Sequence, residues 1–213
     1  MTDIFELFKK ISSPTSSGQG APEFLVAGLG NPGREYAFTR HNAGFLAMDY
    51  LTEKRNLGDL RTSRFRSLVL QTEVEGHKAL LMKPQTYMNA SGEAVREAAD
   101  FYKIPPEKII VISDDVAQEP GRMRIRRSGS DGGQKGLRSI IEHLGTDAFP
   151  RIRIGVGAKP HPDYPMADWV LSRIPEEDQK KIFSVLGCVS DALPLLFDGR
   201  IEDAMSRYNG VSF

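Results

Sequence analysis

The chain has 213 residues, of which 40% are apolar and 26% charged, and its 28 Lys and Arg are balanced by 28 Asp and Glu. These proportions are typical of a soluble globular domain and exclude a wholly disordered chain. No apolar run approaches the ~20 residues that cross a bilayer, and the acidic N-terminus does not resemble a secretory signal, so we expect a cytoplasmic protein.

Residues 1–22 are predicted to form a flexible N-terminal extension to one globular domain that covers residues 23–213. The second half of the extension, residues 12–22, is rich in Ser, Gly and Pro, which is typical of a flexible linker. Apolar residues near the start leave a short amphipathic docking helix as the alternative, which we disfavour.

From residue 23 onward, two kinds of segment alternate along the chain. In one kind apolar residues recur at about every second position, and in the other at about every 3.6 positions. Strands are predicted at 24–27, 65–74, 78–83, 108–113, 122–127 and 151–156. Helices are predicted at 44–53, 91–102, 133–144, 175–197 and 201–208, and Pro194 is expected to kink or end the fourth. This order predicts an α/β fold, a single-domain three-layer α/β/α arrangement with a twisted mixed β-sheet and helices on both faces.

The segment Gly28–Gly33 follows the first predicted strand and matches the G-x-G-x-x-G fingerprint of dinucleotide-binding proteins. In that fingerprint the third glycine lies inside a helix, whereas Asn31-Pro32-Gly33 favours a turn. No acidic residue closes a second strand about 20 residues further on. A nicotinamide-dependent oxidoreductase is therefore a disfavoured alternative, and we predict no cofactor.

The same strand end is rich in polar side chains, among them Asn31, Tyr36 and His41. His41 lies between turn-forming residues and a helix start, where a reference pKa near ~6.5 suits a general base once a carboxylate orients the ring. A lone histidine is more often structural, which is our interpretation of the other three. Cys188 is the only cysteine, and no Cys/His cluster has zinc-ligand spacing, so we predict no metal site.

Two further strand ends carry polar groups. Asn89 precedes the helix predicted at 91–102, where an N-cap is its plain structural role. Asp114 follows the strand predicted at 108–113, where an Asx-type turn is the plain structural role. Ligands bind beyond the carboxyl ends of strands in open α/β sheets, so both residues are candidates for a site.

The bases are concentrated in one part of the chain. Residues 122–159 contain nine Lys and Arg against three Asp and Glu, a net charge of +6, while the segments before and after have net charges of −2 and −4. Within this part, a Gly-rich loop at 128–137 opens a helix, a geometry that attracts phosphate. The pattern predicts a basic face for a polyanion, although an evenly solvated surface explains the charge count equally well.

Together these segments resemble the bacterial-type peptidyl-tRNA hydrolase family over nearly all of residues 23–209. The most specific segments are Gly-Leu-Gly-Asn-Pro-Gly and Thr-Arg-His-Asn-Ala-Gly within 28–44 and Pro-x-Thr-Tyr-Met-Asn-x-Ser-Gly at 84–92, with support from 114–115, 132–137 and 151–155. The resemblance implies a monomeric enzyme that recycles tRNA by hydrolysing the ester between a peptide's carboxyl end and the terminal ribose of peptidyl-tRNA.

The resemblance also implies a role for each candidate residue. His41 is the general base that activates water, Asp114 orients its ring, and Asn89 stabilises the developing oxyanion. Asn31 and Asn89 both bind the substrate. The other implied contacts are Tyr36 and Met88 in the substrate groove, and Arg124, Arg126 and Arg153 toward tRNA phosphate.

This chain departs from the family pattern at Gln134-Lys135, where many members have His-Asn. The family's Asn is assigned to positioning water and the acceptor end. A lysine offers three donors and no acceptor, so Lys135 can hold a phosphate but cannot replace an amide. We therefore expect hydrolysis to be retained and the contacts to the tRNA end to be altered.

A non-catalytic RNA-binding protein on the same fold, like the related plant organelle splicing factors, is the main alternative function. It is disfavoured because the four residues that the resemblance assigns to catalysis are all present, namely Asn31, His41, Asn89 and Asp114.

Overall fold

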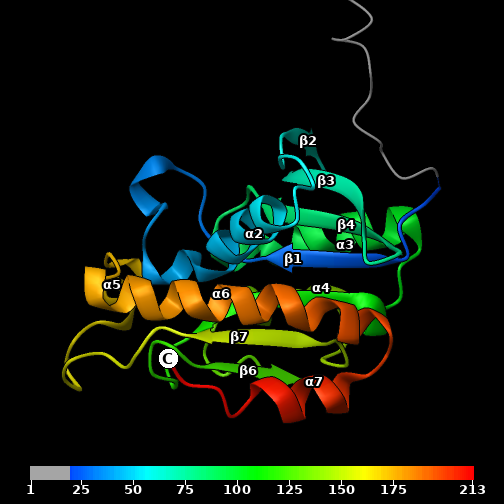
Figure 1. The fold of residues 1–213 in the computed structure, drawn as a ribbon. Helices are drawn as coiled ribbons and strands as arrows, with labels where there is room; N and C mark the ends of the chain where they lie inside the picture. Colours follow the sequence, from blue (N-terminus) through cyan, green and yellow to red (C-terminus); the bar gives the residue numbers. More distant parts are fainter. Residues whose placement is uncertain (1–19) are drawn as a thin grey trace, which may run out of the picture.

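The computed structural model of the chain describes residues 20–213, so most of the predicted N-terminal extension lies outside the described residues. One sheet with the strand order β2-β3-β4-β1-β5-β7-β6 lies between two layers of helices (Figure 1). The predicted three-layer α/β fold is confirmed.

The centre of the sheet is parallel and both edges are antiparallel. β4, β1, β5 and β7 run parallel to one another, whereas β2 and β3 on one side and β6 on the other run antiparallel to their neighbours. The sheet is therefore mixed, as predicted. The strands are β1 (Phe24–Gly28), β2 (Thr62–Arg64), β3 (Ser67–Val74), β4 (His77–Pro84), β5 (Ile109–Asp115), β6 (Met123–Arg126) and β7 (Arg151–Gly155).

Each face of the sheet has its own apolar core. On one face, Val26 and Ile112 pack beneath α2, α6 and α7, and on the other, Leu25 and Val111 pack beneath α3 and α4. Because β1 and the first half of β5 are buried on both faces, their sequences are apolar at every position rather than at alternate ones. The α-helices are α2 (Ala43–Lys54), α3 (Ser91–Tyr102), α4 (Lys135–Leu144), α5 (Met166–Leu171), α6 (Glu176–Phe197) and α7 (Ile201–Tyr208).

Two glycines allow α2 to pack directly on the sheet. A Cβ atom on Gly44 would lie 2.3 Å from the Leu29 nitrogen and 2.4 Å from the Ile112 carbonyl oxygen, and one on Gly28 would lie 2.4 Å from the Gly44 carbonyl oxygen. The first glycine of the fingerprint thus serves close packing of helix on strand. This packing draws the turn before α2 to the carboxyl end of β5.

The structure contains two elements that were not predicted. β2 and α5 were not predicted, because three exposed residues and a six-residue helix carry too little periodicity to be recognised. Pro194 does not end α6, which continues to Phe197 and is closed by the Asp198 N–H donating to the Pro194 carbonyl at 3.0 Å. Among helices within residues 20–213, none combines the length and apolar character of a membrane span.

Candidate active site

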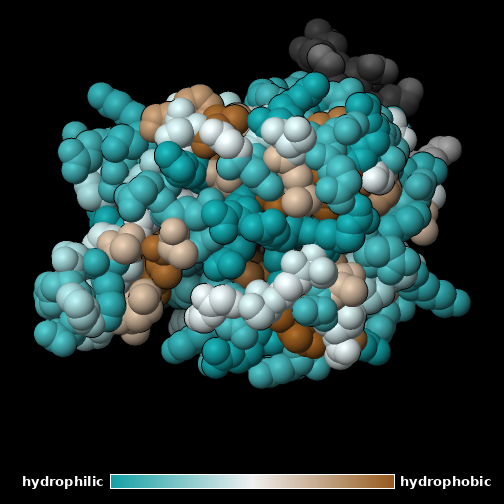
Figure 2. All heavy atoms as spheres, turned by 90° about the horizontal axis from the view of Figure 1, so that it is seen from below, coloured by the Kyte–Doolittle hydropathy of each residue, from teal (hydrophilic) through white to brown (hydrophobic). Residues whose placement is uncertain are grey.

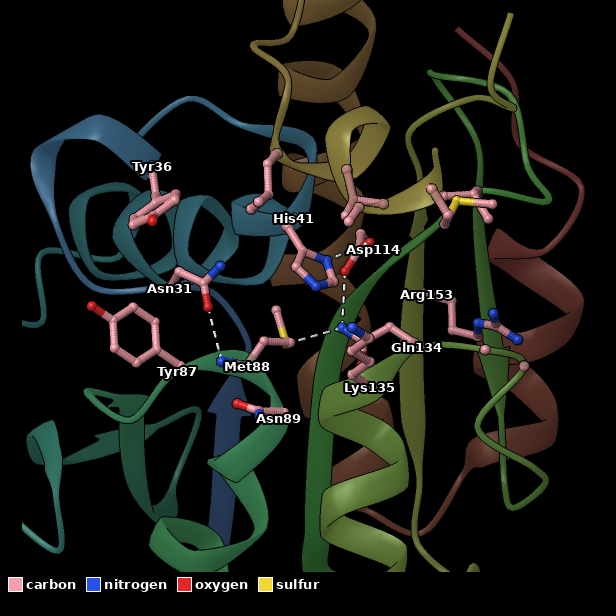
Figure 3. A pocket seen from close by; sticks show the side chains of 17 residues that line it. Asn31, Tyr36, His41, Tyr87, Met88, Asn89, Asp114, Gln134, Lys135 and Arg153 are labelled. Carbon is pink, nitrogen blue, oxygen red and sulfur yellow. Dashed lines mark hydrogen bonds and ion pairs between the residues drawn. The ribbon is translucent and has the colours of Figure 1, made fainter. Parts of the chain in front are cut away.

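A pocket of about 510 Å³ opens at the carboxyl ends of β1, β4 and β5 (Figure 3). Parallel strands end at the same edge of a sheet, so loops far apart in sequence meet there. Eight of the ten predicted site residues line the pocket: Asn31, Tyr36, His41, Met88, Asn89, Asp114, Lys135 and Arg153. The other two, Arg124 and Arg126, are not part of its lining.

Three chain segments bring the polar groups together. The 3₁₀ turn η2 (Arg40–Asn42) follows β1 and carries His41. The 3₁₀ turn η3 (Met88–Ala90) follows β4, and Asp114 lies near the end of β5. A histidine, an amide and a carboxylate from three separate strand ends therefore surround one cavity.

His41 and Asp114 form a buried pair. Nδ1 of His41 lies 3.0 Å from Oδ2 of Asp114, and the two residues are 7% and 2% exposed. A carboxylate only accepts hydrogen bonds, so Nδ1 carries the hydrogen and the lone pair resides on Nε2. Nε2 has no hydrogen-bond partner within residues 20–213, which leaves a basic nitrogen available in the pocket.

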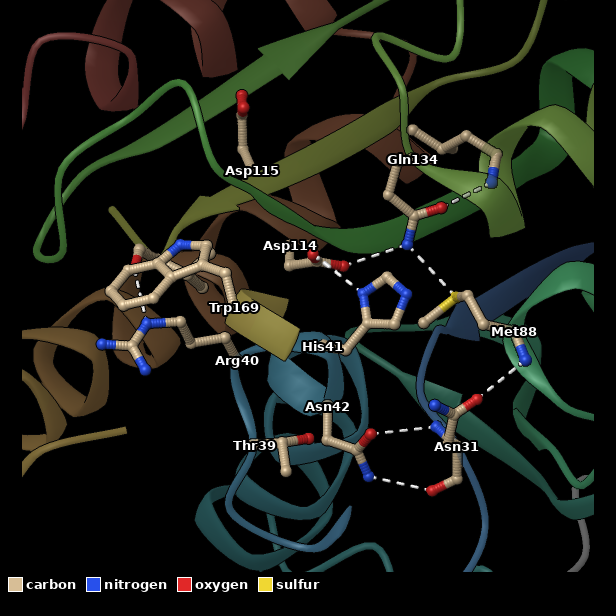
Figure 4. Close-up of polar contacts among 12 residues, drawn as sticks. Asn31, Thr39, Arg40, His41, Asn42, Met88, Asp114, Asp115, Gln134 and Trp169 are labelled. Atoms are coloured by element: carbon tan, nitrogen blue, oxygen red, sulfur yellow. Dashed lines mark hydrogen bonds and ion pairs between the residues drawn. The ribbon is translucent and has the colours of Figure 1, made fainter. Parts of the chain in front are cut away.

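Gln134 binds the other oxygen of the same carboxylate. Its Nε2 donates to Oδ1 of Asp114 at 3.0 Å and lies 3.2 Å from the Met88 sulfur (Figure 4). Its Oε1 accepts the N–H of Leu137 at 2.8 Å, which caps the N-terminus of α4. Sequence reasoning noted Gln134 only as a departure from a pattern. A glutamine before a helix signals capping at most, and no local signal reveals the carboxylate 20 residues away.

Asn31 is held so that its amide hydrogens remain available. Asn42 accepts the Asn31 N–H at 2.9 Å and donates to the Asn31 carbonyl at 3.0 Å. Oδ1 of Asn31 accepts the backbone N–H of Met88 at 2.8 Å. This hydrogen bond fixes the orientation of the side chain, which leaves its NH₂ group available as a donor to a ligand.

The plain structural roles considered for Asn89 and Asp114 are not observed. Ala90, not Asn89, precedes α3, and the exposed Asn89 side chain makes no hydrogen bond within the described part of the chain. The Asx-type turn after β5 is formed by Asp115, whose Oδ1 accepts the Ala117 N–H at 2.9 Å. Both predicted site residues are therefore free of the local role that could have explained them.

Comparison with known proteins identifies the family. The family model described as peptidyl-tRNA hydrolase matches residues 25–213. The peptidyl-tRNA hydrolases of Caldicellulosiruptor bescii and Clostridium novyi are 49% and 44% identical to this chain, each over 88% of it and over 97% and 98% of their own lengths. A crystal structure of the Acinetobacter baumannii peptidyl-tRNA hydrolase superposes with a TM-score of 0.83 at 35% identity, covering 92% of this chain and 99% of that one.

The chain belongs to the peptidyl-tRNA hydrolase family. The predicted resemblance, enzyme class and hydrolase activity are thereby confirmed. No cluster of three His, Cys, Asp or Glu side chains suited to a metal ion occurs among residues 20–213.

In this peptidyl-tRNA hydrolase, α5 forms one wall of the pocket and is anchored next to His41. The Arg40 guanidinium donates to the Ser172 hydroxyl at 2.7 Å and to the Arg173 carbonyl at 2.9 Å, and its Cζ lies 3.6 Å from the Trp169 ring centroid. Burial lowers the pKa of Arg40, while the Asp178 carboxylate opposes that shift. The wall itself consists of Met166, Ala167, Val170 and Leu171.

The predicted basic residues form a face that extends from the pocket to the β6 edge. Arg153 lines the pocket, with its Nη2 3.2 Å from Oδ1 of Asp115, and Arg124 is its register partner across β6 and β7. Register partners point to the same side of a sheet, so Arg124 and the neighbouring exposed Arg126 continue the charge outward. The lower side of the molecule, where β6 and α7 lie in Figure 1, is mainly hydrophilic with smaller apolar patches (Figure 2).

Two bases of the same segment have different environments. Arg151 is 1% exposed, donates to the Asp147 carbonyl at 2.6 Å and to the Gly-rich loop, and burial lowers its pKa. It is therefore structural. Lys135 is exposed at the first position of α4, where the helix dipole disfavours a cation. A residue placed against the dipole at the pocket mouth is better suited to binding an anionic ligand than to stabilising the helix.

Proposed function

We propose that this peptidyl-tRNA hydrolase uses Nε2 of His41 as a general base toward water. Nε2 takes one proton from a water molecule while the water oxygen attacks the carbonyl carbon of the ester. The tetrahedral intermediate then breaks its bond to the ribose oxygen, which receives the proton back from the imidazolium. The 3.0 Å contact between His41 and Asp114 carries this proposal, because it orients the ring and stabilises the cation that forms.

The amides of Asn31 and Asn89 are the proposed donors to the substrate. Asn31 has its amide hydrogens available, and Asn89 is free at the pocket wall, so Asn89 is our candidate for the oxyanion donor. One such donor contributes ~10²–10³-fold to the rate of acyl transfer. Tyr36 and Met88, also in the lining, are proposed to contact the terminal adenosine or the peptide.

We propose that the basic face binds the phosphate backbone of the tRNA, with the acceptor end in the pocket. Support comes from Lys135 and Arg153 at the pocket and from Arg124 and Arg126 beyond it. Phosphate contacts release counterions, so affinity is expected to fall as salt rises. We also propose that the active form is a monomer and that it acts on peptidyl-tRNA in the cytoplasm.

A cleavage assay on N-acetyl-aminoacyl-tRNA tests the proposal. We expect the natural chain to release tRNA from this substrate and to spare aminoacyl-tRNA with a free α-amino group. His41→Ala is expected to lose nearly all turnover and still to bind tRNA. Substantial cleavage by that variant would contradict the role of His41, and tRNA binding without cleavage by the natural chain would favour the non-catalytic alternative.

A further inference from the structure

The Gln134 amide is fixed between α4 and Asp114, and the two contacts determine its orientation. Oε1 must face Leu137, since an N–H requires an acceptor, and the NH₂ group must then face the carboxylate. Gln134 is 7% exposed and Asp114 is 2% exposed, so neither oxygen of the carboxylate depends on bulk water for a donor. Both oxygens are satisfied by protein groups, one by His41 and one by Gln134.

Capping of α4 does not by itself explain this glutamine. Helix N-caps are typically Ser, Thr, Asp or Asn, whose short side chains reach the N–H two or three residues on. Gln134 caps through its Oε1 and extends its Nε2 to a catalytic carboxylate. The added length therefore produces one contact that a typical cap does not make, and that contact lies inside the pocket.

We propose that Gln134 is a positioning residue for the Asp114–His41 pair, acting as a hydrogen-bond donor that does not titrate. The inference rests on the proposed role of His41 as the base. A donor on Oδ1 keeps Oδ2 aimed at Nδ1 of His41, and it favours the ionised carboxylate. Leaving Oδ1 buried without a donor would favour rotation or protonation of Asp114, and either change releases the imidazole.

Substitution by glutamate converts this donor into a titrating group of the same shape. In Gln134→Glu, one oxygen still accepts the Leu137 N–H, and the other donates to Asp114 only while it is protonated. Once ionised, it repels the neighbouring Asp114 carboxylate, which the two residues avoid by sharing one proton. The other titratable groups that line the pocket around them are His41 from η2, Lys135 from α4, Arg153 from β7, Tyr36 from the 3₁₀ turn η1 (Arg34–Tyr36) and Tyr87 ahead of η3.

The experiment is the pH profile of kcat/KM on N-acetyl-aminoacyl-tRNA, corrected for uncatalysed ester hydrolysis. For the natural chain we expect a rise as His41 loses its proton, followed by a plateau. For Gln134→Glu we expect the same rise and then a loss of roughly tenfold or more on the alkaline side, giving a bell. For Gln134→Leu, which lacks the donor at every pH, we expect kcat to fall roughly tenfold with KM within about twofold and with the plateau retained.

Gln118 provides a matched control. Its Nε2 donates to Oδ2 of Asp115 at 2.9 Å and it is 8% exposed, so it repeats the glutamine–aspartate contact one residue along β5 and outside the pocket lining. Gln118→Glu is expected to keep the plateau of the natural chain. An alkaline loss in Gln118→Glu as well would show a general effect of a buried carboxylate and overturn the proposal.

The remaining outcomes separate this inference from the proposed function. The role of Gln134 would be overturned if kcat/KM of Gln134→Glu stayed on a plateau at alkaline pH, or if kcat of Gln134→Leu equalled that of the natural chain. Either result would leave the role of His41 intact. Retained cleavage by His41→Ala in the same assay would instead overturn the proposed mechanism. Thermal melting of each variant checks that it is folded, and if Gln134→Glu does not fold, kcat of Gln134→Leu decides the question.

Discussion

The guanidinium of Arg40 stacks on the ring of Trp169, with Cζ 3.6 Å from the ring centroid, and this contact ties the pocket wall to the residue preceding His41 (Figure 4). Trp169 also donates from Nε1 to the Gly157 carbonyl at 2.8 Å. The ring therefore links α5 both to η2 and to the loop after β7. A change at this ring should alter how α5 closes the pocket without altering the catalytic groups.

We predict that Trp169→Ala raises KM for N-acetyl-aminoacyl-tRNA by roughly three- to tenfold, because a buried cation–π contact contributes ~1–2 kcal/mol. The value of kcat should change less, since His41 and Asp114 keep their own contact. Steady-state kinetics measure both. Phe183→Ala, which removes an exposed aromatic ring on α6, is the control and should leave KM unchanged. An unchanged KM in Trp169→Ala would show that the stack does not hold the wall.

Asp114→Asn should lower kcat by ~10²–10³-fold while the protein stays folded. The carboxylate accepts from His41 on one oxygen and from Gln134 on the other, whereas an asparagine has only one oxygen. Its NH₂ group must face one of these two donors, so only one of the two hydrogen bonds can form. Single-turnover rates under saturating enzyme measure the effect, and circular dichroism checks the fold. A rate within about threefold of the natural chain would argue against the orienting role of Asp114.

Arg124→Ala should weaken tRNA binding and reduce the slope of log K against log salt by about 0.9 for each phosphate that the variant no longer neutralises. Arg61→Ala is the matched control, because Arg61 is also exposed and adjoins β2 at the opposite edge of the sheet. Filter binding or fluorescence anisotropy at several salt concentrations measures both slopes. Equal slopes in the two variants would place the tRNA elsewhere than on the β6 edge.

Lys135→Ala and Lys135→Asn should both weaken the contact to the tRNA end and raise KM. The same substitutions should slightly raise the melting temperature, because a cation at a helix N-terminus opposes the dipole by ~0.3–1 kcal/mol. Single-turnover rates and thermal melts together test the pair of effects. If neither rate nor affinity changes in either variant, Lys135 has no part in binding.

Local sequence patterns encode most of the secondary structure and the order of its layers. Alternating apolar residues in β6 and continuous apolar runs in β1 and β5 reflect burial on one face or on both, and burial is a property that local periodicity records. The family resemblance also rested on segments that are contiguous in sequence. Local pattern failed where an element is short, as with β2 and α5.

Contacts between residues far apart in the sequence determine the different roles of neighbouring or chemically similar side chains. Asp114 and Asp115 are adjacent in β5, but successive side chains of a strand point to opposite faces, so one meets His41 and the other caps a turn and holds Arg153. Gln134 reaches Asp114 because α4 begins beside the end of β5, a distance that folding sets across 20 residues of chain. Catalytic geometry depends on such long-range contacts, and local sequence does not encode their lengths.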